Sequence, residues 1–251
     1  MSSFRHSVSQ WCFRGIPLPE LCRAAKAMGI ASVELLEPHE WPMVREHGLV
    51  CALGRSPDTI TDSLNDRRNH ARLIPAYRER IRAAAAAGVP ALCCFSGNRH
   101  GRTDEEGLAD CAEGFRQLAP VAEETGVTLC LELLNSKIDH PDYQCDTTAW
   151  GVELCRQVNS PRVRLLYDIY HMAVMGEDPI ARIRQYHRWF AHYHTAGVPG
   201  RHEIDGGQTL DYPAIMRAIQ ATGFTGFVGH EFLPQRDPLT SLREAVKICT
   251  V

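Results

Sequence analysis

Four polar side chains in the second half of the chain come late in apolar runs. They are Glu132 in LCLELLN, Asp168 in LLYDIYH, His194 in AHYHTAG and Glu231 in VGHEF. Each one alone would be an ordinary hydrogen-bonded residue at the end of a strand. Three carboxylates and an imidazole that converge in a low-dielectric site would repel one another strongly unless protons or a divalent cation lay among them. The four residues together therefore predict a divalent-metal site.

The predicted ligand set is rich in oxygen and contains one nitrogen. Such a set suits Mn²⁺, Mg²⁺ or Co²⁺ better than a structural zinc ion, for which sulfur or several imidazoles are usual. We expect one of these three ions and no organic cofactor. Because side chains alternate along a strand, His192 should lie on the same face as His194, with His194 nearer the end of the strand.

Two residues near this cluster could contact a substrate. His171 follows Asp168 by three residues, where we expect a loop, and it would be a substrate contact, an outer partner of the metal site or an ordinary loop histidine. Arg201 lies in GVPGRHEID, and its planar fork suits a bidentate bond to a substrate carboxylate. A salt bridge with Glu203 or Asp205 is the alternative for Arg201. Further candidate substrate contacts are Asn135 and Lys137 in LLNSK and His100 in GNRHG.

Short apolar runs and amphipathic stretches alternate along the whole chain. We expect strands within residues 4–11, 30–37, 49–54, 91–97, 127–135, 163–171, 190–197 and 224–232. Helical patterns follow each of them, including residues 74–88 and a long helix that begins with Thr103 and Glu106 in capping-box spacing. Eight such units predict a single (β/α)₈ TIM barrel over residues 1–251. A doubly wound open sheet is the competing arrangement.

In such a barrel the carboxyl ends of the strands carry the chemistry, which is where the four predicted ligands lie.

The chain has 27 basic and 30 acidic residues, so it has no surplus of basic residues for binding nucleic acid or an anionic membrane. No apolar run is long enough to predict a membrane span, and the opening residues do not predict a secretory leader. We expect a cytoplasmic protein with a small-molecule substrate, and a homo-oligomer is compatible with these features. Its ten cysteines are scattered without a C-x-x-C motif and are expected to be buried free thiols.

From about residue 6 onward the chain resembles the hydroxypyruvate isomerase family within the xylose isomerase-like TIM barrels. The matching stretches are SVSQWCF, IPLPELCRAAKAMGI, CFSGNRHGRTDEEGL, LCLELLNSKIDHPDYQCDTTAWG, LLYDIYHM, HYHTAGVPGRHEID, LDYPAIMRAI and GHEF. The resemblance implies a metal-dependent isomerase that interconverts hydroxypyruvate and tartronate semialdehyde.

The resemblance also implies roles for particular residues. Glu132, Asp168, His194 and Glu231 would hold the divalent metal. Glu132 and Glu231 would in addition be the pair that transfers protons. His171 and Arg201 would hold the oxygens or the carboxylate of the substrate.

Three other functions remain open from the sequence. A ketose 3-epimerase or another keto-sugar isomerase would use the same metal and the same two glutamates. A phosphodiesterase of the endonuclease IV type shares a D-x-x-H pair like Asp168 and His171, but it needs further ligands, including a D-x-H pair where this chain has RHEID. A barrel that only binds a metal or a small acid is the third alternative, although both glutamates are present.

Overall fold

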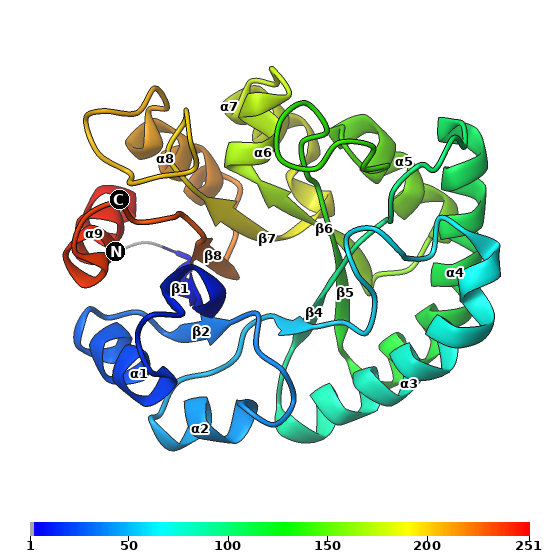
Figure 1. Ribbon diagram of the computed structural model, residues 1–251, viewed down its shortest axis with the longest axis horizontal. Helices are drawn as coiled ribbons and strands as arrows, with labels where there is room; N and C mark the ends of the chain where they lie inside the picture. The colour runs from blue at the N-terminus through cyan, green and yellow to red at the C-terminus, as the bar shows by residue number, and fades with distance from the viewer. Residues whose placement is uncertain (1–2) are drawn as a thin grey trace.

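The alternating strands and helices form a closed parallel barrel in the computed structural model, which describes residues 3–251 (Figure 1). Met1 and Ser2 of the predicted domain lie outside the described residues. The strands are β1 Arg5–Ser9, β2 Ser32–Glu34, β3 Gly54–Arg55, β4 Ala91–Cys94, β5 Thr128–Glu132, β6 Val163–Asp168, β7 Phe190–Thr195 and β8 Phe227–His230.

The sheet confirms the predicted (β/α)₈ barrel and excludes the open doubly wound sheet. Its strands are ordered β2-β1-β8-β7-β6-β5-β4-β3, and seven parallel ladders join neighbours in this order. Isolated parallel bridges from Ser32 to Val50 and from Leu36 to Gly54 close the ring between β2 and β3. All strand ends that carry chemistry therefore point toward one mouth.

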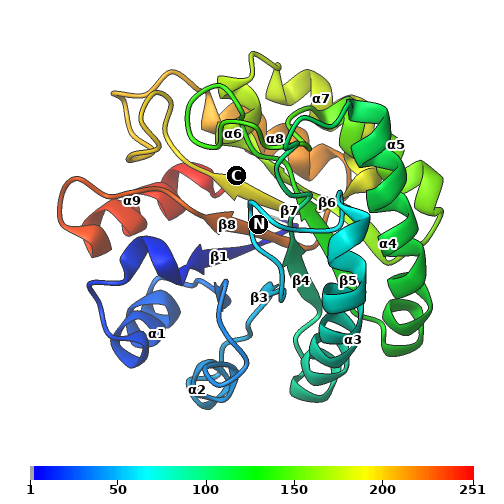
Figure 2. The same ribbon diagram turned by 45° about the vertical axis from the view of Figure 1, so that its right-hand side comes forward.

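The helices surround the strands, as Figure 2 shows. They are α1 Leu18–Ala27, α2 Trp41–Glu46, α3 His70–Ala87, α4 Asp104–Thr125, α5 Thr148–Val158, α6 Ile169–Val174, α7 Pro179–Tyr186, α8 Tyr212–Ala221 and α9 Pro238–Cys249. Short 3₁₀ helices cover Gln10–Phe13, Arg67–Asn69 and His187–Trp189. The predicted capping box of α4 is present between Thr103 and Glu106.

Two expectations about local structure were wrong in detail. The third strand was expected over residues 49–54, but only Gly54–Arg55 forms a ladder. One cause is that the Ala52 backbone N–H donates to the hydroxyl of Ser32 at 2.9 Å instead of to a backbone carbonyl of β2. His171 was expected in a loop, but it lies in the first turn of α6, which Asp168 caps by accepting the His171 backbone N–H at 2.9 Å.

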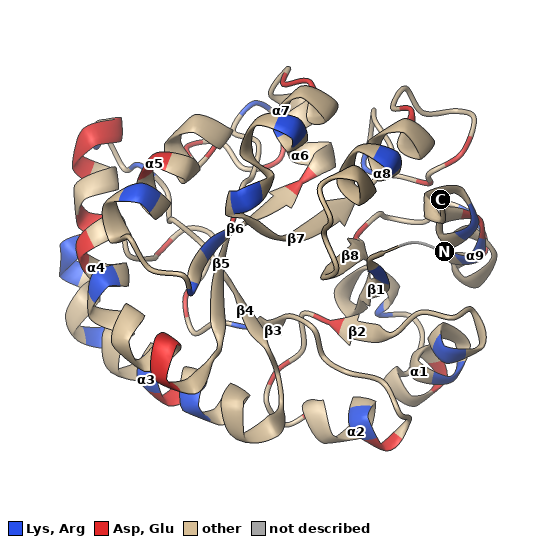
Figure 3. Cartoon of the chain, turned by 180° about the vertical axis from the view of Figure 1, so that it is seen from behind, with Lys and Arg blue, Asp and Glu red and all other residues tan. Residues whose placement is uncertain are grey.

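The main apolar core lies between the strands and the helices, and a smaller cluster includes Cys130 and Leu166 of the strands with Leu35 directly after β2 and Leu53 directly before β3. All ten cysteines are free, and nine of them are buried, as the sequence indicated. Acidic and basic residues are interspersed over the outer helices (Figure 3). Within residues 3–251, no helix combines the length and apolar character that crossing a bilayer requires.

Two buried histidines join β1 to β8. The His6 and His230 rings stack with centroids 5.2 Å apart, and His6 Nδ1 lies 3.2 Å from His230 Nε2. His6 Nε2 lies 3.1 Å from the Thr250 hydroxyl, which itself donates to the Val246 carbonyl and so can accept from His6. A neutral His6 satisfies this arrangement, and burial lowers the pKa of His6 to about 4.

This low pKa predicts that acid destabilises the protein partly through His6. Between about pH 6.5 and pH 4, His6 in the unfolded chain binds a proton that the folded protein excludes, so stability is lost as the pH falls through this range. The shift corresponds to about 3 kcal/mol. Urea unfolding of metal-free protein between pH 7 and pH 4 should show a smaller pH dependence of the unfolding free energy for His6→Gln than for wild type. The exposed His187 provides the control His187→Gln, which should keep the wild-type slope; equal slopes for wild type and His6→Gln would contradict the prediction.

Candidate active site

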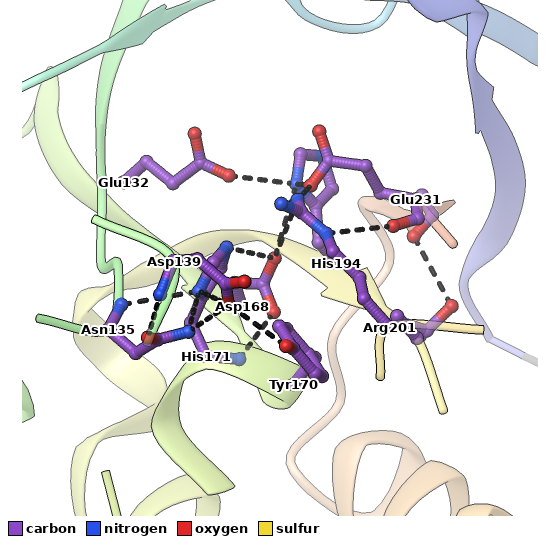
Figure 4. Close-up of polar contacts among 12 residues, drawn as sticks. Glu132, Asn135, Asp139, Asp168, Tyr170, His171, His194, Arg201 and Glu231 are labelled. Atoms are coloured by element: carbon purple, nitrogen blue, oxygen red, sulfur yellow. Dashed lines mark hydrogen bonds and ion pairs between the residues drawn. The ribbon is translucent and has the colours of Figure 1, made fainter. Parts of the chain in front are cut away.

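The structure brings the four predicted ligands together at the mouth of the barrel (Figure 4). Glu132 and Asp168 are the last residues of β5 and β6, His194 is in β7, and Glu231 directly follows β8. All four are buried, and each offers one ligand atom within 4.8 Å of those of the others. Parallel strands end at one edge of the barrel, so residues far apart in sequence meet here.

His194 lies at the centre of this cluster. Its Nδ1 is 3.1 Å from Glu132 Oε1 and 3.1 Å from Glu231 Oε2, and its Nε2 is 2.9 Å from Glu34 Oε1. Burial by itself would lower the pKa of His194, but these carboxylates outweigh it and raise the pKa well above its usual range. Without a metal, His194 is therefore an imidazolium that donates from both nitrogens.

Glu34 is a member of the site that the sequence reasoning missed. It is the last residue of β2, it is fully buried, and it also lies 3.1 Å from His192 Nε2, which shares the face of His194 as expected. Burial alone would raise the pKa of Glu34, but His192 and His194 reverse the effect and lower it. Glu34 within IASVELLE is the same kind of signal as Glu132, a carboxylate late in an apolar run, but it lies on a strand in the first half of the chain, outside the four predicted ligands.

Arg201 is the second buried cation of the cluster. Its Nη2 lies 2.5 Å from Glu231 Oε2 and 3.9 Å from Asp168 Oδ2, and its guanidinium lies 5.1 Å from the ring centroid of Trp11. The alternative salt bridge to Glu203 or Asp205 is absent among the described residues, because both carboxylates pair with Arg236.

Trp11 also binds Glu231 and was likewise missed by the sequence reasoning. Its indole N–H donates to Glu231 Oε1 at 2.6 Å, from the 3₁₀ helix that follows β1. Both oxygens of Glu231 therefore accept a hydrogen bond. Burial would raise the pKa of Glu231, but His194, Arg201 and Trp11 together hold it well below its usual range.

Asn135 determines which ring nitrogen of His171 carries the proton. The Asn135 side-chain oxygen accepts the backbone N–H groups of Ile138 and Asp139 at 3.0 and 2.9 Å, which places its NH₂ group toward His171. The Asn135 backbone N–H and side-chain NH₂ lie 3.2 and 2.6 Å from His171 Nδ1, so Nδ1 must accept. Burial, supported by Arg201, lowers the pKa of His171 well below its usual range.

A neutral His171 with Nδ1 as acceptor carries its proton on Nε2. This Nε2 lies 3.8 Å from Asp168 Oδ2 and has no hydrogen-bond partner within residues 3–251. A buried N–H without a partner costs free energy. His171 is thus a donor available to an oxygen atom of a ligand beside Asp168.

The other two candidate contacts lie away from the site. Lys137 Nζ donates to the Met175 carbonyl at 2.7 Å, where the end of α6 leaves backbone acceptors free. His100 is exposed, and its Nε2 lies 3.3 Å from the Thr61 carbonyl. Neither side chain lines the cavity that opens onto the cluster.

A cavity of about 640 Å³ opens onto the cluster. Glu132, Glu231 and Arg201 line it together with the apolar side chains of Trp11 and Phe95. A concave and largely apolar space with a few convergent charged groups is typical of a small-molecule site. Both candidate proton-transferring glutamates can therefore reach a molecule in this space.

The donor set of the cluster fits a divalent cation. Within residues 3–251, four buried carboxylates, those of Glu34, Glu132, Asp168 and Glu231, lie around Arg201 and the His194 imidazolium, with His192 also beside Glu34. Burial, with Glu231 adding to it and Arg201 opposing it, raises the pKa of Asp168 to about 7. Glu132, Asp168, Glu231 and His194 Nδ1 would hold the ion, and Glu34 would then accept the Nε2 proton of His194, which is the usual second partner of a ligating histidine.

Carboxylates and a histidine at the strand ends of a parallel barrel define a barrel with a candidate metal site. The chain belongs to the xylose isomerase-like TIM barrel family, whose family model matches residues 22–249. It is similar to a putative hydroxypyruvate isomerase of Homo sapiens, with 29% identity over 96% of this chain and 94% of the relative. A 2-oxo-tetronate isomerase of Haemophilus influenzae is 26% identical over 92% of this chain and 93% of the relative. These relatives confirm the resemblance inferred from the sequence.

Solved structures share the fold over nearly the whole chain. A protein of Brucella melitensis described as an AP endonuclease of family 2 is 26% identical, with a TM-score of 0.83 over 96% of this chain and 97% of its own. The 3-keto-D-glucoside 4-epimerase YcjR of E. coli is 19% identical, with a TM-score of 0.79 over 98% of both chains, which shows the fold alone.

The contact between Glu34 and His194 predicts that Glu34→Gln weakens metal binding. The amide cannot accept the His194 proton as strongly as the carboxylate does, so we expect a loss of about 10- to 100-fold in metal affinity. Titration of Mn²⁺ against a competing chelator would measure this. Glu37→Gln is the matched control, because Glu37 lies three residues along the chain and pairs with Arg80 instead of a histidine. Equal affinities for wild type and Glu34→Gln would remove Glu34 from the metal site.

Proposed function

We propose that this chain is a divalent-metal-dependent isomerase of small hydroxy-carbonyl acids, which interconverts hydroxypyruvate and tartronate semialdehyde. The observation that carries the proposal is the pair of glutamates, Glu132 and Glu231, which both contact His194 and both line the cavity. The relatives named hydroxypyruvate isomerase and 2-oxo-tetronate isomerase support it. The metal would be Mn²⁺, Mg²⁺ or Co²⁺, held by Glu132, Asp168, His194 and Glu231.

The reaction moves a proton between adjacent carbons through an enediol, so its barrier comes from forming a carbanion beside a carbonyl. When bound, the cation supplies positive charge that stabilises the enediolate oxygens. The protein must then remove a proton from one carbon and return it to the neighbouring carbon, while the proton of the hydroxyl group passes to the former carbonyl oxygen.

We assign the proton transfers to the two glutamates. Trp11 and Arg201 orient Glu231 by one hydrogen bond to each of its oxygens. Among the described residues, Glu132 Oε2 accepts a hydrogen bond only from the weak thiol donor of Cys93 at 3.3 Å, so this oxygen is the more available one for a proton of the substrate.

His171 and Arg201 would position the substrate. The Nε2 proton of His171, fixed by Asn135, would be donated to a substrate oxygen, so Asn135 acts through His171. Arg201, held over Trp11, would present positive charge to the substrate carboxylate while it also binds Glu231.

A ketose 3-epimerase would use the same residues, and the size of the cavity is compatible with a ketose. A phosphodiesterase of the endonuclease IV type is disfavoured for two reasons. Glu203 lies in RHEID, where that type needs a D-x-H pair of ligands, and it already accepts the backbone N–H groups of Gln235 and Arg236 at 2.8 and 3.1 Å. The net charge of −3 also offers no surplus of basic residues for a phosphate backbone.

A cytoplasmic location, a small-molecule substrate without nucleic-acid or membrane partners, and homo-oligomer formation stay predictions.

Metal removal should abolish the reaction. We expect chelated protein to lose deuterium incorporation into hydroxypyruvate in D₂O, followed by NMR, and Mn²⁺, Mg²⁺ or Co²⁺ to restore it, because the enediolate then regains its counter-charge. A parallel sample with D-fructose tests the epimerase, which would exchange the proton at C3. Full exchange by metal-free protein would contradict the metal dependence.

Glu231→Gln should lower the turnover of hydroxypyruvate by about 10²- to 10⁴-fold, because the amide cannot carry a proton between the carbons. The assay is the appearance of tartronate semialdehyde at saturating Mn²⁺, with the bound metal and the melting temperature measured in parallel. Glu244→Gln is the control, because Glu244 pairs with Arg236 on the surface. Near-normal turnover of a metal-loaded Glu231→Gln protein would remove Glu231 from the pair.

A further inference from the structure

Among the described residues, Arg55 is a cation of the cavity without a carboxylate partner. It is the last residue of β3, and its side chain lines the cavity and is exposed. Its Nε donates to the Leu35 carbonyl at 2.8 Å, which fixes the orientation of the guanidinium. Within residues 3–251, no carboxylate forms an ion pair with Arg55, and neither of its terminal nitrogens donates a hydrogen bond.

The other two arginines of the cavity already have partners. Arg80 pairs with Glu37 at 3.2 Å and donates to the Arg55 backbone carbonyl at 2.6 Å, which supports the main chain at this position. Arg201 pairs with Glu231 and Asp168. An anion that enters the cavity therefore finds unpaired positive charge at Arg55.

The neighbouring carboxylate Asp58 also has its own donors. It accepts from the Ser63 hydroxyl at 2.5 Å and from the Phe95 backbone N–H at 3.0 Å. The side chain of Asp58 is thus turned to the protein, and it leaves the terminal nitrogens of Arg55 free for a ligand.

Arg55 lies across the barrel from the metal cluster. In the closed ring of strands, β3 is four strands away from β7 in either direction, and the four candidate metal ligands come from β5 to β8. The cavity of about 640 Å³ spans both sides, and it lies within the range of about 300–1,000 Å³ that encloses drug-sized ligands. A three-carbon acid would leave much of this space unfilled.

We propose that Arg55 is a second anion-binding position, which receives the terminal carboxylate or phosphate of a hydroxy-carbonyl chain longer than three carbons. The two free terminal nitrogens form the planar fork that binds such groups through two parallel hydrogen bonds. This proposal rests on the proposed function, because it places the carbonyl end of the substrate at the proton-transferring pair Glu132 and Glu231 and the anionic end at Arg55. The substrate class is then an acidic or phosphorylated ketose, with its anionic group at the end remote from the reacting carbons.

The test compares three ketohexoses that differ only at C6: D-fructose, D-fructuronate and D-fructose 6-phosphate. Calorimetry on the Mg²⁺-loaded protein at about 0.15 M ionic strength, where long-range charge effects are screened, gives a Kd for each. We expect at least one anionic ligand to bind about tenfold or more tightly than D-fructose, as a charge-assisted hydrogen-bonded pair provides. The stronger of the two anions identifies the terminal group.

Variants then assign the preference to Arg55. Arg55→Gln should remove the preference for the anion and leave the Kd of D-fructose unchanged, and Arg55→Lys should keep part of it. Arg14→Gln is a matched control, because Arg14 is also exposed and also donates from Nε to a backbone carbonyl, that of Trp11 at 3.1 Å, but does not line the cavity. It should keep the full preference.

Equal binding of all three ketohexoses to wild type, or an anion preference that survives in Arg55→Gln, would overturn the proposal. The proposed isomerase function fails by a different result, the absence of metal-dependent proton exchange with any hydroxy-carbonyl substrate. An Arg55-dependent anion preference without exchange would support the binding position while refuting the isomerase.

Discussion

The burial of four carboxylates around one imidazole is the constraint on which the rest of the structure depends. Glu34, Glu132 and Glu231 all contact His194, and Asp168 lies at the edge of the same group. Buried charge is costly unless it is paired and hydrogen-bonded. The barrel meets this cost by bringing the ends of β2 and of β5 to β8 together, and each of these strands contributes one side chain. The barrel fold therefore determines which charged side chains meet, and the cluster in turn requires that these strand ends converge.

The neighbouring hydrogen-bond donors make the two central glutamates unequal. Glu231 receives an indole and a guanidinium from segments that follow β1 and β7, whereas Glu132 receives a thiol from β4. Strong donors hold a carboxylate in its ionised and oriented form, and a weak donor leaves a lone pair accessible. An apparently symmetric pair of glutamates thus consists of one tightly held and one more accessible carboxylate.

Much of this arrangement could be predicted from the sequence, because a parallel barrel converts strand order into spatial order. The eight strand units, the four clustered residues and the shared face of His192 and His194 follow from periodicity and from the position of polar residues at strand ends. The contacts of Trp11 and Arg201 with Glu231 could not be predicted. Both residues lie in segments outside the strands, and hydrophobic periodicity does not describe the course of such segments. The sequence could not show that Asn135 belongs to the site and Lys137 does not, because the two residues are close together in the chain. The side chain of Lys137 is directed away from the site by its hydrogen bond to a free backbone carbonyl at the end of α6.

The amide of Asn135 has a consequence for the chemical durability of the site. Its oxygen is held by two backbone N–H groups, so its NH₂ group faces His171 and, together with the Asn135 backbone N–H, keeps His171 Nδ1 an acceptor. Deamidation would exchange this NH₂ group for an oxygen of nearly the same size, and two acceptors would then face each other across 2.6 Å. A proton on Nδ1 would relieve this contact at the expense of the hydrogen bond from the Asn135 backbone N–H, and a neutral ring with that proton would no longer present one at Nε2. A single hydrolysed amide could thus silence His171 as a donor without changing the shape of the barrel, a form of ageing that measurements of folding would not detect.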